Sequence, residues 1–188
     1  MGTKFSTCVW VSVVGIASIF FGSKGYADTV ISVADFGLKP DTRENAVAYV
    51  QKAIEACRGK EPVTLVFPEG RYDFWPQYAH EKNYYETNTY DVFPKRLAML
   101  FEGLHNITVD GSGSQFIMHD RIQPITVENC DGVTLKNFSI DWDIPLTAQA
   151  RVTKVGSDFF EIEINVLESP YIIEDGKLVF VGEGWKSA

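Results

Sequence analysis

The sequence predicts an all-β protein built as a parallel β-helix, from an internal repeat and from strand patterning without a helical period. Glu102–Gly111 aligns with Glu128–Asn137 without a gap, and residue types match along the alignment. The equivalent pairs are Ile107 with Val133, Thr108 with Thr134, Val109 with Leu135, Met99 with Ile125 and Phe101 with Val127. A repeat of about 20 to 50 residues indicates a solenoid, in which each unit covers its neighbour's apolar face. Because this unit contains short strands, each turn of the solenoid is expected to be a coil of strands, with Val109, Leu135 and Ile140 pointing inward.

One amphipathic helix is expected ahead of the strands. Asp35-Phe36-Gly37 reads as a short strand, and Lys39-Pro40-Asp41 reads as the turn that follows it. Apolar residues then recur at spacings of 3, 4 and 3, at Val47, Val50, Ile54 and Cys57. This period predicts a helix over Ala46–Arg58, with a cap at Asp41 or Thr42. Such a helix would cover the open apolar end of the first coil.

The first coil is expected to consist of Val63–Phe67, the turn Pro68-Glu69-Gly70 and Arg71–Phe74. A polar segment dense in aromatic residues, Trp75–Lys95, interrupts the next coil. Loops of this length inside a compact fold are usually functional or mobile. Two interpretations of its aromatic rings stay open: they stack on sugar faces, or they pack the loop onto the side of the solenoid.

Hairpin patterning replaces coil patterning after Asp143. Gln149–Val155 and Phe159–Ile164 alternate apolar and polar residues around a Gly-Ser-Asp turn, and a second hairpin is expected around Glu174-Asp175-Gly176. These residues predict a small antiparallel β domain whose closing element would lie after Ala188. The expected organisation is therefore a signal peptide over residues 1–27, a cap and first coils over 28–145, and the start of the inserted domain over 146–188, in an N-terminal piece of a longer protein.

The N-terminus resembles a cleavable signal peptide. Lys4 precedes an apolar stretch from Cys8 to Phe21, and Gly25-Tyr26-Ala27 occupy the positions that a signal peptidase reads. The stretch is short for a bilayer span of about 20 apolar residues. Cleavage after Ala27 is therefore favoured over a stable membrane anchor, and the mature protein is expected to be periplasmic or secreted.

The charge of the chain disfavours some classes of partner. The formal net charge is −8, and cleavage would remove Lys4 and Lys24 but no acidic residue. A surface of that sign repels nucleic acid, so a neutral partner such as a glycan fits better. Cys57 and Cys130 would remain, and two buried thiols are favoured over one disulfide. No motif predicts a metal site or another cofactor, and an oligomer stays open.

Two groups of charged residues are candidates for substrate binding. Asp141 and Asp143 are two apart on an expected strand, which places them on one face about 6.6 Å apart. That spacing is near the lower edge of the ~6.5 to 9.5 Å between the carboxylates of inverting glycosidases. Catalysis, substrate contact and ordinary strand-end turn chemistry all stay open for this pair. Asp120 and Arg121, which follow His119 at a coil turn, could bind a hydroxyl-rich ligand or form a surface salt bridge.

Four stretches resemble glycoside hydrolase family 110, the bacterial exo-acting α-1,3-galactosidases: ADFGLKPDTRENAVAYVQKAIEAC, VTLVFPEGRYDFW, NITVDGSGSQFIMHDRIQPITVENCDGVTLKNFSIDWDIPLTAQARV and GEGW. The opening motif is shared widely among β-helix enzymes, whereas LKNFSIDWD leading into the hairpins is more particular. The resemblance implies a right-handed parallel β-helix interrupted by a β-barrel domain. It also implies hydrolysis, with inversion, of terminal α-1,3-linked galactose from blood group B type glycans. The catalytic aspartates of the family belong to coils that would follow Ala188, so no catalytic residue is assigned here and this chain alone is expected to be inactive.

Two alternative functions share the expected fold. A polysaccharide lyase would need calcium ligands and a cationic base in its groove, and the sequence offers no acidic calcium cluster. A noncatalytic carbohydrate-binding β-helix would be compatible with the aromatic segment.

Overall fold

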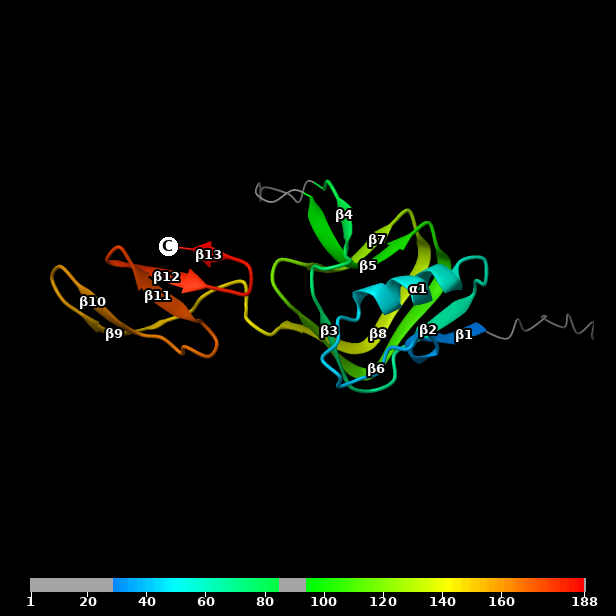
Figure 1. Ribbon diagram of the computed structural model, residues 1–188, viewed down its shortest axis with the longest axis horizontal. Helices are drawn as coiled ribbons and strands as arrows, with labels where there is room; N and C mark the ends of the chain where they lie inside the picture. Colours follow the sequence, from blue (N-terminus) through cyan, green and yellow to red (C-terminus); the bar gives the residue numbers. More distant parts are fainter. Residues whose placement is uncertain (1–28, 85–93, 188) are drawn as a thin grey trace, which may run out of the picture.

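The computed structural model describes residues 29–84 and 94–187 (Figure 1). The expected signal peptide and its cleavage site lie outside the described residues, as do residues 85–93 of the aromatic segment. No helix in the described ranges is long and apolar enough to cross a membrane.

The described residues are mostly β-structure, which confirms the predicted all-β class. They contain one α-helix, α1 (Val47–Cys57), and a single 3-10 turn, η1 (Val33–Phe36). The strands are β1 (Thr29–Ser32), β2 (Val63–Val66), β3 (Arg71–Phe74), β4 (His80–Lys82), β5 (Lys95–Glu102), β6 (His105–Met118), β7 (Gln123–Glu128), β8 (Asp131–Trp142), β9 (Arg151–Val155), β10 (Phe160–Glu163), β11 (Tyr171–Glu174), β12 (Lys177–Val181) and β13 (Lys186–Ser187).

The sequence repeat appears in the structure as parallel strand pairing. β6 pairs with β8 so that Ile107 lies beside Val133, and β5 pairs with β7 so that Met99 lies beside Ile125. Both pairings join the residues that the sequence repeat aligns. β2 and β3 pair in parallel with β6, and β1 pairs in parallel with β2. Like residues therefore stack on like residues along the ladders. We call β1–β8 with α1 the parallel part.

The core of the parallel part lies between the parallel strands and α1. The face of α1 that repeats at 3 and 4 residues is buried, which places Val47, Val50, Ile54 and Cys57 against the strands. Phe116 of β6 packs its ring 4.7 Å from Phe67 and 5.7 Å from Phe74, measured between centroids. Cys57 and Cys130 are free thiols, and burial raises the pKa of Cys57 to about 11.

Three details of the N-terminal elements differ from the sequence prediction. The residues read as a strand, Asp35-Phe36-Gly37, form η1 and the left-handed glycine that ends it, because Ser32 and Asp35 make a capping box. The strand lies just before them, as β1. Helix α1 begins at Val47 rather than Ala46, and Asn45 instead of Asp41 or Thr42 accepts the hydrogen bond from its first backbone N–H.

The outer strand β8 departs from the expected burial. Val109 on β6 is buried, as its inward position in the repeat predicts. Leu135 and Ile140 on β8, expected to point inward and be buried as well, are 40% and 37% exposed. The reason is that β8 pairs with β6 on one edge and no described strand covers its other edge. The repeat thus identifies the inward face without fixing what covers it.

The hairpins expected after Asp143 are present. β9 and β10 pair antiparallel around Gly156, and β11 and β12 pair antiparallel around Asp175-Gly176, with β13 added to the edge of β12. The described strands of this region form two small sheets that do not close into a barrel. Figure 1 shows these hairpins, in orange and red, beside the parallel part rather than stacked on it. We call β9–β13 the hairpin part.

Candidate functional site

The principal charged cluster forms where three neighbouring strands end. β3, β6 and β8 lie side by side, with Phe74 paired to Met118 and Met118 paired to Trp142. The residues that follow these positions are Trp75, His119 and Asp143. Because the strands are parallel and in register, their carboxyl ends meet at one edge of the sheet. This register brings together side chains that lie far apart in sequence.

Arg71 joins two carboxylates of the cluster. Its Nη2 atom lies 2.6 Å from Asp73 Oδ1 and 2.7 Å from Asp143 Oδ1. The Arg71 Nε atom also donates to both oxygens of Asp73, at 3.0 Å. Arg43 lies 3.8 Å from Asp143 and is mostly exposed. The fork of a guanidinium suits such a fixed pair of acceptors.

His119 is buried between two carboxylates. Its Nε2 atom lies 2.8 Å from Asp73 Oδ1, and its Nδ1 atom lies 2.7 Å from Glu183 Oε1. Ionised carboxylates only accept hydrogen bonds, so both contacts are satisfied when both ring nitrogens carry a proton. The ring of Trp75 stacks on the imidazole, with centroids 3.9 Å apart and planes 8° apart. The stacked Trp75 ring and the two carboxylates together fix the orientation of the imidazole.

The charges in the cluster shift the pKa of its members. Burial by itself raises the pKa of Asp73, but hydrogen bonds from Arg71 and His119 oppose burial and leave that pKa below its ordinary value. The pKa of Arg71 is raised, chiefly by its hydrogen bond to Asp73 and despite partial burial. Asp73 is therefore held as a carboxylate and Arg71 as a cation.

One group of potential metal ligands lies in the described ranges, formed by Asp73, His119 and Asp143, whose ligand atoms lie within 4.8 Å of one another. The Arg71 guanidinium already lies against both aspartates, at 2.6 and 2.7 Å. It supplies the positive charge that a cation would bring. We therefore interpret the group as an ion-pair network.

The four residues predicted to bind substrate have different surroundings in the structure. Asp143 joins the cluster through Arg71, with a side chain 38% exposed. Asp141 lies on β8 and accepts from the backbone N–H of Trp142. Asp120 has a left-handed backbone, with φ of 55°, and its Oδ1 atom is buried without a hydrogen-bond partner. Arg121 is exposed. Whether any of them binds substrate stays a prediction.

The sequence interpretation did not assign roles to Arg71, Asp73 or Glu183. It read His119 only as part of a surface cluster, whereas the side chain is buried. One signal was present, since Arg71 and Asp73 are two apart on an expected strand and so share a face. Their partners come from 46 to 72 residues away in the chain, which spacing along the sequence does not encode.

A second charged cluster ties the start of the aromatic segment to the strands. Glu102 and Glu128 lie side by side in the β5–β7 ladder, and Lys82 Nζ lies 2.7 and 2.8 Å from their carboxylates. Tyr84 donates a hydrogen bond to Glu128. The ammonium group thus offsets the repulsion between stacked glutamates. Two described aromatic residues of the segment, Trp75 and Tyr84, pack or bond to the protein, and Tyr78 is 75% exposed.

Both parts of the chain are similar in sequence to known proteins. Residues 148–188 match the family model described as GLAA-B beta-barrel domain I. The chain is 62% identical over 162 residues to alpha-1,3-galactosidase B of Bacteroides thetaiotaomicron, which covers 86% of this chain and 26% of that protein. It is 36% identical over 158 residues to alpha-1,3-galactosidase A of Shewanella woodyi, again 26% of that protein.

The chain therefore spans about a quarter of the length of these curated relatives. A third relative, alpha-1,3-galactosidase B of Phocaeicola vulgatus, is 36% identical over 98% of this chain. The match thus extends through the parallel part and the hairpin part alike. The resemblance to the α-1,3-galactosidases that the sequence motifs predict is confirmed.

Proposed function

We propose that this chain is part of an exported α-1,3-galactosidase that removes terminal α-1,3-linked galactose from glycans, with inversion at the anomeric carbon. The observation that carries the proposal is the 62% identity over 162 residues to a protein named alpha-1,3-galactosidase B. The acidic composition agrees with a neutral glycan as substrate, because it disfavours polyanionic partners.

For the architecture, we propose a right-handed parallel β-helix that carries the hairpin part as the beginning of a barrel domain. Parallel ladders support the first element: β5–β7 pairs residues 26 apart, and β6–β8 pairs them 26 apart up to Asp110 and 24 apart from Ser114. The match of residues 148–188 to a β-barrel family model supports the second. In a solenoid of this kind, the ends of successive strands line up along one edge and can present a row of side chains to an extended glycan.

The described charged residues suit contact with substrate better than catalysis. Inverting hydrolysis needs one carboxyl group free to act as acid and another free to act as base. Asp73 is buried and committed to Arg71 and His119, so it is unsuited to either role. Asp143 is bonded through Oδ1 and partly exposed, and its carboxylate can accept a hydrogen bond from a sugar hydroxyl. By the resemblance, the catalytic aspartates belong to coils outside this chain.

A chimera tests the proposed activity. The segment of the Bacteroides thetaiotaomicron relative that matches this chain would be replaced by the corresponding residues of this chain. Galactose release would then be measured from a linear α-1,3-linked disaccharide and a branched blood group B trisaccharide. We expect turnover within about tenfold of the parent, because a shared scaffold should hold the same active centre. The present chain alone is expected to release no galactose.

Two controls accompany the chimera. The first is an α-1,4-linked galactobioside, which should not be cleaved. The second is a chimera with Leu65→Asp, which buries an unpaired charge at a fully buried position and should not fold. A chimera that melts cooperatively but releases no α-1,3-linked galactose would contradict the proposal. Binding of the trisaccharide without cleavage would favour a noncatalytic carbohydrate-binding protein instead.

A further inference from the structure

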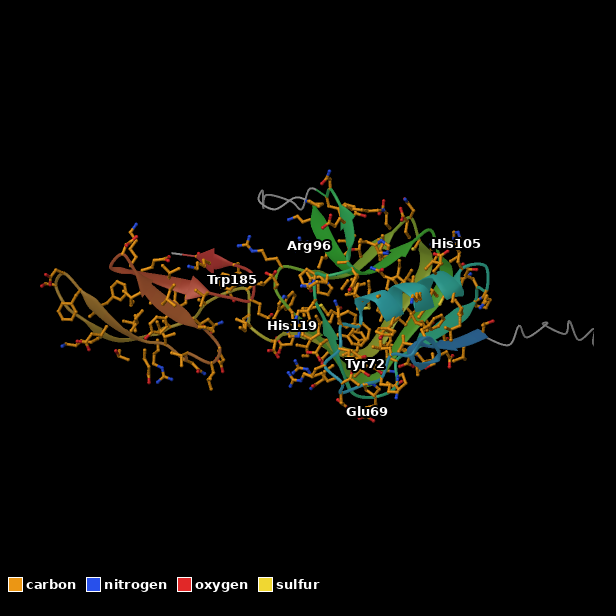
Figure 2. The ribbon with its side chains drawn as sticks, in the orientation of Figure 1. Glu69, Tyr72, Arg96, His105, His119 and Trp185 are labelled. Carbon is orange, nitrogen blue, oxygen red and sulfur yellow. The ribbon has the colours of Figure 1, made fainter. Side chains whose placement is uncertain are left out.

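The turn between β12 and β13, Gly182-Glu183-Gly184-Trp185, reaches from the hairpin part to the parallel part. The Gly182 backbone N–H donates to the Trp185 carbonyl at 2.9 Å, which closes the turn. Figure 2 labels Trp185 on the hairpin part and His119 on the edge of the parallel part that faces it. The turn therefore lies where the two parts meet.

Glu183 uses both carboxylate oxygens across this junction. Oε1 lies 2.7 Å from His119 Nδ1, and Oε2 accepts the backbone N–H of Asp120 at 3.0 Å. These two hydrogen bonds join the hairpin part to the parallel part. His119 is buried and the Glu183 side chain is 24% exposed. Charge-assisted hydrogen bonds shielded from water in this way are among the stronger polar contacts in proteins.

The glycines on either side of Glu183 are required by close approach rather than by backbone conformation. A Cβ atom on Gly184 would lie 2.1 Å from Asp120 Oδ2 and 2.4 Å from its Cγ atom. A Cβ atom on Gly182 would lie 2.1 Å from Trp185 Nε1. Neither glycine has a positive φ. The turn thus fits against Asp120 with no room for a methyl group.

The receiving loop is held in a fixed shape. Asp120 has a left-handed backbone, a conformation that aspartate tolerates better than most residues. Its N–H donates to Glu183, and its carbonyl accepts from Trp142 Nε1 at 3.2 Å. Both backbone polar groups of Asp120 are therefore oriented by side chains from outside the loop.

From these contacts we infer that the Gly182–Trp185 turn is a latch that fixes the hairpin part on the parallel part and couples its position to Asp143. A continuous series of short contacts runs from Glu183 to His119, from His119 to Asp73, and from Asp73 through Arg71 to Asp143. The four distances are 2.7, 2.8, 2.6 and 2.7 Å. Releasing the turn removes the Glu183 carboxylate from His119. The imidazole then keeps Asp73 as the one carboxylate that orients it, and the contacts that lead on to Asp143 are perturbed.

The latch has a mechanical consequence. Neighbouring domains joined by a small polar interface move relative to each other by default. Apart from the latch, the covalent link between the two parts is the segment 143–150, between β8 and β9. Opening the latch should therefore let the two parts reorient independently while each keeps its own fold.

NMR relaxation of the chain tests this inference without any measurement of activity. Backbone ¹⁵N relaxation gives a rotational correlation time for each part, and hydrogen exchange reports the Asp120 amide directly. In the wild type, both parts should share one correlation time. In Glu183→Ala and in Gly184→Ala, the hairpin part should tumble separately with a shorter time, and the Asp120 amide should exchange at least about tenfold faster.

Glu174→Ala is the matched control, because Glu174 forms its ion pair with Lys186 inside the hairpin part. It should leave both readouts at wild-type values. If either variant loses the dispersed amide spectrum of one part, Glu183→Gln is measured in its place. The glutamine side chain keeps one acceptor oxygen, so the Asp120 backbone amide should exchange at an intermediate rate. Separate tumbling in the wild type, or a common correlation time with unchanged Asp120 exchange in the folded variants, would overturn the inference.

Discussion

Replacing Asp73 tests whether the buried contacts of the charged cluster stabilise the fold. Asp73 is 1% exposed and accepts hydrogen bonds from Arg71 at 2.6 and 3.0 Å and from His119 at 2.8 Å. Asp73→Asn keeps the shape of the side chain but removes its charge. Removing one partner of a buried ion pair costs about 3 to 5 kcal/mol, because the other partner is left uncompensated. We expect a value near the lower end, about 3 kcal/mol, since Arg71 keeps Asp143 and His119 keeps Glu183.

The matched control is Asp143→Asn, in the same network but with a side chain 38% exposed. Exposed ion pairs contribute about 0 to 1 kcal/mol. For a chain of this size, 1 kcal/mol corresponds to about 2 to 4 °C in melting temperature. Asp73→Asn should therefore lower the melting temperature at pH 7 by roughly 6 to 12 °C and Asp143→Asn by at most about 4 °C. Equal decreases in melting temperature for the two variants, measured by calorimetry, would refute the claim that the buried contacts of Asp73 stabilise the fold more than the partly exposed contacts of Asp143.

The pH dependence gives a further test of Asp73. Its pKa in the folded protein is lowered, so the stabilisation is fully present above the ordinary aspartate pKa of about 3.9 and is lost as the pH falls through the lower, folded value. The difference in melting temperature between the wild type and Asp73→Asn should accordingly narrow below about pH 4. A difference that stays constant from pH 7 to pH 2.5 would contradict this account.

Three further predictions concern the core, substrate contact and export. Phe116→Ala should cost about 3 to 5 kcal/mol whereas Phe160→Ala, at a position 65% exposed, should cost less than about 0.5 kcal/mol; similar melting temperatures would disprove the proposed aromatic core. In the chimera, Asp141→Asn and Asp143→Asn should raise KM with little change in kcat, and a thousandfold fall in kcat at unchanged stability would assign them to catalysis. Mature protein from the periplasm should begin at Asp28, and recovery of chains that begin at Met1 would exclude the expected cleavage.

Patterns local in sequence predicted the elements of secondary structure well. The spacing of 3, 4 and 3 located α1, and the alternation after Asp143 located the hairpins, because both depend on which side of one element faces the core. The internal repeat predicted the pairing of Ile107 with Val133, because stacking like residues is how a repeated strand covers its neighbour. The relationship to α-1,3-galactosidases also followed from motifs in the sequence.

Burial at the outer strand depended on the tertiary structure. Leu135 repeats Val109 in the sequence, yet Val109 is fully buried and Leu135 is 40% exposed. A pattern of apolar residues identifies the face of a strand that becomes buried when another element packs against it. Whether cover is present depends on the neighbouring strand, which for β8 is β6 alone within the described structure.

The charged cluster, likewise, came from the tertiary structure. The sequence by itself indicated that Arg71 and Asp73 share a face of one strand and that Asp143 lies at the end of another, and it included GEGW among the stretches that resemble the family. Only the fold placed His119 between Asp73, 46 residues before it, and Glu183, 64 residues after it. Such contacts depend on the register of parallel strands and on how the hairpin part docks. Buried charges stabilise a fold only when all of their partners are in contact. Because these partners come from distant segments, no single segment of the sequence predicts the cluster.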